Sequence, residues 1–267
     1  MKTNKINWYQ IFKYSVYLAV LTNVFLFLIK EGNAAVHRLD GEYSFAELIS
    51  AYVSTIDTTA WAVLLILFEL ETYVIPIEKL KKGLQWFFML IRGGCYAIVL
   101  TSLWGYMGGW IWLQGFESVT IGGLCEVVGQ SWMIELDEFK TIGASDCSTL
   151  AKGEQFFRHT AKAVYTDNVF LNETFWLTGV DILNSLAWIL VVIVLEVDVW
   201  LQLKNRLVGR TFFFSKYIKN ALYCILLFAA VYWGVFGDFL EFWDAFLWIV
   251  AFFFIEMNLI EWQKKSS

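Results

Sequence analysis

The sequence predicts an all-α integral membrane protein with six transmembrane helices, and its composition and hydropathy predict this class. Of the 267 residues, 58% are hydrophobic and 17% are charged, whereas roughly a quarter of the residues in an ordinary soluble domain are charged. The mean hydropathy of +0.57 comes from long apolar runs that each contain only one or two charged residues. A soluble domain of this composition would expose large apolar patches to water, so the function classes of soluble proteins are excluded.

Each apolar run is close to the 20 or so residues that a helix needs to cross a hydrocarbon layer roughly 30 Å thick. The runs are residues 11–28, 58–75, 84–105, 182–201, 211–235 and 245–260. They divide the chain into a membrane part over 1–105, an insertion outside the membrane over 106–181, and a second membrane part over 182–267. The one proline, Pro76, falls at a predicted helix end, so we expect straight helices.

The charge distribution predicts the orientation of the chain. Most Lys and Arg residues fall on the side of the N-terminus when the loops are assigned alternately to the two sides. By the positive-inside rule, both termini are therefore expected in the cytoplasm. A bacterial inner membrane is the expected location. The sequon Asn172-Glu173-Thr174 leaves a eukaryotic endomembrane as the alternative.

The four cysteines separate into two kinds. Cys125 and Cys147 lie in the insertion, on the side where an oxidising compartment lets thiols pair, so we predict that they form a disulfide. Cys95 and Cys224 lie in apolar helices and are expected to be small buried side chains.

An internal repeat is the most specific feature of the sequence. The second, fourth and sixth predicted helices share the pattern [Asp/Asn]-x3-Trp-x7-Glu-x-[Glu/Asp/Asn], and the other three share [Lys/Arg]-x3-Tyr-x3-Leu. We infer three copies of one helical hairpin. The first pattern begins at Asp57, Asn184 and Asp244, and the second begins at Lys13, Arg92 and Lys219.

The repeated charges are expected to meet at one depth in the inner leaflet. From the helical rise, each glutamate of the first pattern lies about 18 Å beyond the Asp or Asn that begins it. The basic residues of the second pattern reach the same level. The layer contains Glu69, Glu196 and Glu256 opposite Lys13, Arg92 and Lys219, with Tyr17, Tyr96 and Tyr223 as hydrogen-bonding partners.

Two further acids make this layer a candidate functional site. Glu71 and Asp198 follow Glu69 and Glu196 by two residues, and such positions point about 200° apart on a helix. Five carboxylates then face three cations, and the excess charge requires protons, cations or a partner chain. The alternatives are that the layer only holds the helices together, or that Glu71 and Asp198 reach Lys79 and Lys204 near the inner surface.

The remaining repeated positions are expected to be structural. The tryptophans at 61, 188 and 248 fit an aromatic belt at the interface, and Asp57, Asn184 and Asp244 fit helix caps. Ser44 and Glu47 form a capping-box pattern, which predicts that a helix begins outside the membrane.

Motifs for catalysis are absent from the sequence. The chain has two histidines, His37 and His159, and neither a phosphate-binding loop nor a nucleophile elbow occurs. We therefore expect no enzymatic activity, no metal and no cofactor. Nucleic-acid binding is not expected either, because the orientation of the chain already accounts for its basic loops.

Two functions remain as hypotheses. The favoured one is a non-catalytic membrane subunit that docks other membrane chains, or a second copy of itself, through its bundle and outer insertion. The alternative is a proton or small-cation channel or transporter that uses the carboxylate layer.

Overall fold

The computed structural model describes residues 8–39, 43–75, 82–203 and 210–266. Within them the chain is largely helical, and four helices are long and apolar enough to cross a membrane. A bent pair of helices, counted as one span, makes a fifth. The Cys125–Cys147 disulfide is present, which confirms that prediction.

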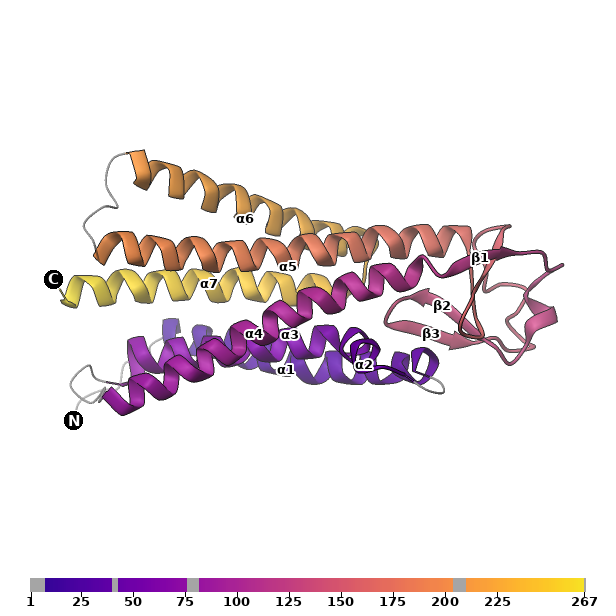
Figure 1. Cartoon of the computed structure of the whole chain (residues 1–267), viewed down its shortest axis with the longest axis horizontal. Coiled ribbons are helices and arrows are strands. Elements are labelled where there is room, and N and C mark those ends of the chain that lie inside the picture. Colours follow the sequence, from indigo (N-terminus) through magenta and orange to yellow (C-terminus); the bar gives the residue numbers. More distant parts are fainter. Residues whose placement is uncertain (1–7, 40–42, 76–81, 204–209, 267) are drawn as a thin grey trace.

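Six long helices pack side by side in one elongated bundle (Figure 1). The most extensive contacts between these helices run in the order α1, α3, α4, α5, α6, α7 and back to α1. The first turn of α1 and the last turns of α7 lie at one end of the bundle, and the β-strands lie at the other, which we call the strand end (Figure 1). The helices are α1 (Trp8–Arg38), α3 (Val53–Glu69), α4 (Lys82–Leu113), α5 (Asn168–Leu203), α6 (Arg210–Phe236) and α7 (Phe239–Ser266).

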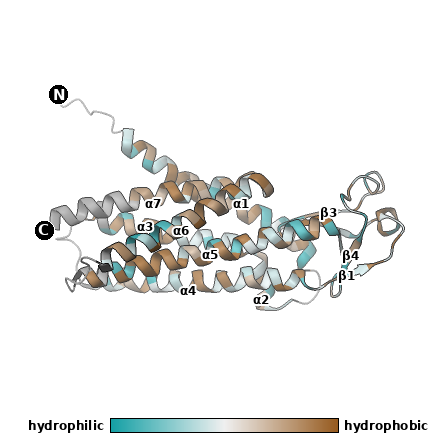
Figure 2. Ribbon diagram, turned by 90° about the horizontal axis from the view of Figure 1, so that it is seen from above, coloured by the Kyte–Doolittle hydropathy of each residue, from teal (hydrophilic) through white to brown (hydrophobic). Residues whose placement is uncertain are grey.

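The bundle is held together by an apolar core to which all six helices contribute. Fully buried members include Val20 on α1, Val191 on α5 and Ala251 on α7. Hydrophobic residues prevail along the long helices (Figure 2), and many large ones are exposed, among them Leu18 on α1, Leu90 on α4 and Phe253 on α7, as in helices that face lipid. Cys95 is buried as expected, whereas Cys224 is exposed; the sequence places it in an apolar run but does not show which face of α6 meets the core.

The second span is bent. A short helix α2 (Phe45–Ala51) leads into α3 at an angle of 73°. The predicted capping box begins α2: the Ser44 hydroxyl accepts from the Glu47 amide at 3.2 Å, and the Glu47 carboxylate accepts from the Ser44 amide at 2.7 Å. Beyond α3 the chain continues as a π-helical turn, η1 (Leu70–Val74). The expectation of straight helices therefore fails here, although no proline is involved within the described residues.

The bend at Tyr52 leaves the first amide groups of α3 without helical hydrogen-bond acceptors, and a side chain from α1 provides the acceptors. The buried carboxylate of Glu31 accepts from the Ser54 amide at 2.7 Å and from the Thr55 amide at 3.0 Å. It also accepts from the Thr55 hydroxyl at 2.6 Å. A carboxylate at a helix N-terminus accepts hydrogen bonds from the free amides and interacts favourably with the positive end of the helix dipole. Glu31 therefore ties α1 to the start of α3.

The insertion carries a five-stranded sheet, so the all-α prediction is wrong for this part of the chain. Its strands have four or five residues with mixed burial, too short a pattern to stand out in the sequence. The spatial order is β1, β4, β5, β2, β3, with β2 and β5 parallel and the other pairs antiparallel. The strands are β1 (Phe116–Val119), β2 (Ser131–Glu135), β3 (Glu138–Thr141), β4 (Phe156–His159) and β5 (Val164–Asp167).

The sheet is fastened to the bundle through the β2–β3 turn. The Arg38 guanidinium on α1 donates to the Leu136 carbonyl at 3.5 Å and to the Ser50 hydroxyl at 3.2 Å. The His37 ring and the Ser131 hydroxyl lie 2.8 Å apart in a hydrogen bond. The turn residues Leu136 and Asp137 are therefore held against the helices at the strand end.

Candidate functional site

The predicted charged layer contains a buried ion pair between α1 and α3. Lys13 Nζ lies 2.5 Å from Glu69 Oε1, and both side chains are almost fully buried. The Tyr17 hydroxyl donates to the same carboxylate at 3.3 Å, and the Tyr14 hydroxyl at 3.2 Å. The first copy of the repeat thus brings its cation, its glutamate and its tyrosine together.

Arg92 and Lys219, the other two cations of the layer, pair with the acid that follows the glutamate by two residues in the repeated pattern. Arg92 on α4 forms an ion pair with Glu71, and Lys219 on α6 lies 2.8 Å from Asp198 Oδ2 on α5. The Ser215 hydroxyl also donates to Asp198, at 2.6 Å. The pairing therefore differs from three cations facing three glutamates. Lys79 and Lys204, the alternative partners, lie outside the described residues.

Among the acids of the layer whose side chains the structure describes, Glu196 lies at the surface. Its side chain is exposed on α5, and the Tyr96 hydroxyl donates to it at 3.2 Å. Tyr223 is half-buried against the apolar core. The side chain of Glu256 lies outside the described part of the chain.

The three repeated tryptophans lie in the centre of the bundle, so their prediction as interfacial belt residues is wrong. Trp61, Trp188 and Trp248 are 6–8% exposed. The ring centroid of Trp61 is 6.0 Å from that of Trp188 and 6.4 Å from that of Trp248. Phe252 packs on all three, with its ring 4.4 Å from Trp188. We call these four aromatic residues the aromatic floor.

The three residues one turn before the tryptophans are predicted to be helix caps, and this prediction is wrong because they lie within helices. Asp57 is inside α3, Asn184 inside α5 and Asp244 inside α7, because each helix begins earlier than its apolar run. The three side chains line one cavity, whose base is the aromatic floor.

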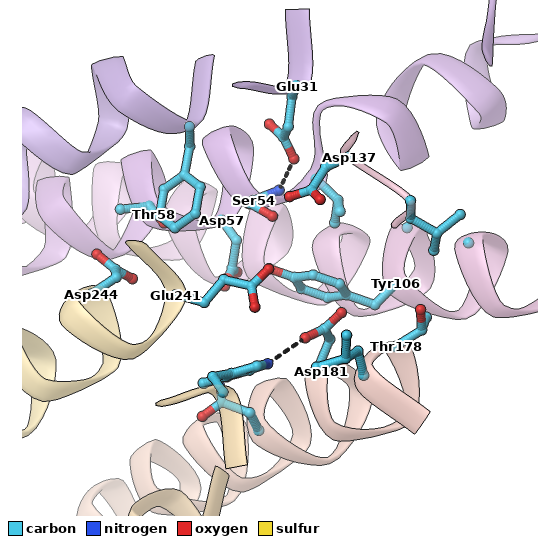
Figure 3. A pocket seen from close by; sticks show the side chains of 18 of the residues that line it. Glu31, Ser54, Asp57, Thr58, Tyr106, Asp137, Thr178, Asp181, Glu241 and Asp244 are labelled. Carbon is cyan, nitrogen blue, oxygen red and sulfur yellow. Dashed lines mark hydrogen bonds between the residues drawn. The ribbon is translucent and has the colours of Figure 1, made fainter. Parts of the chain in front are cut away.

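This cavity lies between the helices at the strand end and encloses about 1100 Å³ of empty space, part of it open to solvent. Figure 3 shows acidic side chains from α1, α3, α5 and α7 around it, with Tyr106 of α4 beside Glu241. The β2–β3 turn covers one side, since Glu135, Leu136 and Asp137 also line it. The cavity therefore has acidic residues toward the strand end and the aromatic floor at its opposite end, along the bundle axis.

Seven carboxyl groups line the cavity, and Arg38 is the basic side chain that lines it among the described residues. Some of these acids have neutral donors: Asp181 accepts from the Trp233 indole at 3.1 Å, and Asp244 from the Asn23 amide at 2.7 Å. The Oδ1 atom of Asp57 is buried and has no hydrogen-bond partner among the described residues. The seven are Glu31, Asp57, Glu135, Asp137, Asp181, Glu241 and Asp244.

A lysine ammonium lies among the acids nearest the strand end. Lys30 Nζ on α1 is 2.7 Å from Asp137 Oδ2 and 3.8 Å from Glu241 Oε1, and it also forms an ion pair with Asp238. One oxygen each of Glu135, Asp137 and Glu241 lie within 4.8 Å of one another, close enough to share a metal ion. This group of acids can therefore hold a positive charge, and in this structure the charge is that of Lys30.

Glu135 shows the effect of crowding acids in this place. Its position on β2 is outside the membrane-spanning helices. Burial and, less strongly, the charge of Asp137 raise the pKa of Glu135 to about 8, although the charge of Lys30 acts in the opposite direction. Its carboxyl group is consequently held partly protonated near neutral pH.

Sequence reasoning missed this cavity because its acids are distributed over segments that appear to be loops or helix ends. Lys30 and Glu31 follow the first apolar run directly, and residues 237–244 resemble a tight turn. The available signal was spacing: Asp238, Glu241 and Asp244 recur every three residues, which places them near one another on a helix.

Comparison with known proteins gives no family assignment. No protein-family model, curated protein or solved structure matches this chain.

The buried pair of Lys13 and Glu69 should be essential for stability. Lys13→Met leaves the Glu69 charge buried without its ammonium, so we expect a loss of about 3–5 kcal/mol in the free energy of unfolding. Lys13→Met combined with Glu69→Leu should recover much of this loss. Thermal unfolding in detergent measures all variants, with Lys216→Met at the exposed Lys216 as the control. Equal stability of Lys13→Met and the control would show that the pair is dispensable.

The raised pKa of Glu135 should make stability depend on pH. Between the usual pKa of 4.5 and the raised value of about 8, the folded chain holds a proton that the unfolded chain releases, so stability falls as pH rises through this window. Glu135→Gln removes the ionisable group. We expect the stability of the variant relative to wild type to increase from pH 5 to pH 8 in thermal unfolding; parallel pH profiles would contradict the assignment.

Proposed function

We propose that this protein is a non-enzymatic, multi-pass membrane protein that binds a cation in the acidic cavity at its strand end. The observation that carries this proposal is the excess of carboxyl groups: seven line the cavity with Arg38 as their basic neighbour. Such an excess in a poorly solvated space requires protons or bound cations for neutralisation. The geometry thus favours the cation hypothesis, with the site moved from the inner charged layer to this cavity.

The proposed topology has six spans, namely α1, α3 with α2, α4, α5, α6 and α7. In a bacterial inner membrane, the strand end would face the outside, and the start of α1 and the end of α7 would face the cytoplasm. This proposal is supported by the positions of the start of α1 and the end of α7, which lie together away from the strands (Figure 1). The positive-inside rule supplies the direction. The cavity would then open toward the outside.

Three repeated hairpins remain part of the proposal. Support comes from equivalent positions that meet: Trp61, Trp188 and Trp248 pack together, and the residues four positions before them line the same cavity. The cation of the first copy pairs with an acid of the same hairpin, whereas the cations of the second and third copies each pair with an acid of the preceding hairpin. A pseudo-threefold bundle places three equivalent polar positions around one central axis, which favours an axial binding cavity.

The inner charged layer has a structural role in this proposal. Three cations each have a carboxylate partner there, so no charge of these pairs remains for a ligand. Trp61 and Glu69 are eight residues apart, or about 12 Å along a helix. The aromatic floor therefore separates the cavity from the layer, and a cation enters from the strand end.

Neutralising the inner part of the cavity should abolish cation binding. We expect calcium chloride or spermidine hydrochloride to raise the thermal unfolding temperature more than sodium chloride of equal ionic strength, since a ligand at one hundred times its Kd stabilises by about 2.7 kcal/mol. Asp57→Asn with Asp244→Asn should remove most of this effect, and Glu154→Gln at an exposed acid should not. If neither cation exceeds sodium chloride for wild type, the proposed function is wrong.

A second candidate function is docking of another membrane chain, and Glu196 favours it. The residue is exposed on α5 with exposed Ile193 and Val197 beside it. A carboxylate that faces hydrocarbon costs several kcal/mol, which a cation on a neighbouring chain would offset. We therefore propose that the α4–α5 face around Tyr96 and Glu196 packs against a transmembrane helix of a partner or of a second copy.

If a second copy is the partner, light scattering in mild detergent should give a protein mass above the 31.0 kDa of one chain. Glu196→Gln should then lower the mass toward one chain, because the variant loses the intermolecular ion pair. Glu154→Gln should leave the mass unchanged. A monomeric wild type would exclude self-association through this face.

A further inference from the structure

Acids in and beside the cavity form two groups at different depths. The outer group surrounds Lys30 and consists of Asp137 and Glu241, which line the cavity, and Asp238, which also pairs with Lys30. The inner group consists of Asp57 and Asp244, each four residues before a tryptophan of the aromatic floor. On α7, Glu241 and Asp244 are three residues apart, a rise of about 4.5 Å. A ligand that reaches both groups must therefore carry positive charge at more than one position.

The outer group is suited to a primary ammonium. The Lys30 ammonium contacts oxygens of three acids: Asp137 in the β2–β3 turn, Asp238 immediately before α7, and Glu241 in the first turn of α7. An ammonium has three N–H donors and can satisfy several carboxylates at once. This arrangement is direct evidence of the chemistry that these carboxylates accept.

The inner group includes a carboxylate oxygen that can accept a hydrogen bond from a ligand. Asn23 is a neutral donor to Asp244, while the buried Asp57 Oδ1 lacks a hydrogen-bond partner within the described ranges. Leaving a buried acceptor unsatisfied costs about 1–3 kcal/mol. A second ammonium placed here would donate to Asp57 and offset the charge of both aspartates.

The rest of the wall fits an alkyl chain between two ammonium groups. Trp61, Trp188 and Trp248 present aromatic surface at the base of the cavity, and tryptophan is the best aromatic partner for a cation. Thr58 and Thr178 supply neutral walls. The lining extends from the aromatic floor to the β2–β3 turn, so the acids are spread over more of the wall than the oxygen ligands of a single metal ion occupy.

We propose that the ligand is a linear diamine or polyamine, with one ammonium between Asp57 and Asp244 and another at the outer group in place of the Lys30 ammonium. This inference rests on the proposed cation-binding function and specifies its ligand class. Lys30 then acts as a tethered competitor for the outer group, which makes it a residue that sets affinity.

The test is calorimetric titration of the purified full-length protein in detergent with spermidine and putrescine. Butylamine, which has one ammonium, and calcium chloride are titrated at matched ionic strength. Wild type should bind the diamine at least tenfold more tightly than butylamine, and more tightly than calcium. This comparison requires no variant, so it is independent of any effect of mutation on folding.

Variants then locate the two ammonium positions. Asp57→Asn should weaken spermidine binding at least tenfold and reduce the advantage of putrescine over butylamine. Lys30→Met should strengthen spermidine binding several-fold, because the competing ammonium is removed. Lys140→Met is the matched control, since Lys140 is an exposed lysine that pairs with Asp146 in the insertion, and it should bind as wild type does.

The outcomes separate this inference from the proposed function. Tight calcium binding that Asp57→Asn abolishes, with no binding of amines, would overturn the polyamine assignment and leave the cation site standing. Equal affinities for putrescine and butylamine would also overturn it, because the second ammonium would then contribute nothing. Absence of binding by all four compounds would overturn both.

Discussion

Neutralisation of buried charge is the constraint on which this bundle depends. An ionised side chain removed from water costs several kcal/mol unless a partner compensates for it. The structure meets this requirement in two ways. Below the aromatic floor, Lys13, Arg92 and Lys219 each pair with one carboxylate from a neighbouring helix. Above the floor, the carboxyl groups outnumber the basic side chains, so the chain alone does not complete the balance.

The shape of the cavity follows from the way in which the strand end is assembled. Glu31 caps α3 from the side, which stabilises a helix start immediately after the 73° bend. The bend turns α2 away from the axis of α3 while α2 still packs against α4, and the β2–β3 turn lines part of the cavity. Arg38 and Lys30 hold that turn through Leu136 and Asp137. A bent span, a sheet and two basic side chains thus create one partly enclosed polar space.

The sequence predicts the parts of this structure that local patterns determine. Hydropathy places the long helices, the capping box places the start of α2, and compartment chemistry predicts the Cys125–Cys147 disulfide. The repeat indicates which residues are equivalent but not which way they face, so Trp61 and its counterparts are assigned to the interface although they meet in the centre. The partners of Arg92 and Lys219 depend on the rotation of α3 and α5 about their axes, which the spacing of charges leaves open. The cavity joins residues from all six long helices, from α2 and from the end of β2 with its turn, and only the tertiary structure brings them together.

The difference between the two charged levels indicates where function resides. A one-to-one buried pair fixes the arrangement of neighbouring helices, yet apolar residues of similar volume often stabilise a fold equally well. The paired level can therefore be understood as a structural element. An excess of acids lowers stability when nothing compensates for it, so stability alone does not account for Asp57, Asp181, Glu241 and Asp244 around one space. Binding of a cation reverses this cost, because a ligand that prefers the folded state stabilises it in proportion to its occupancy. The aromatic floor confines that ligand to the strand end, where Lys30 already shows that an ammonium is accepted.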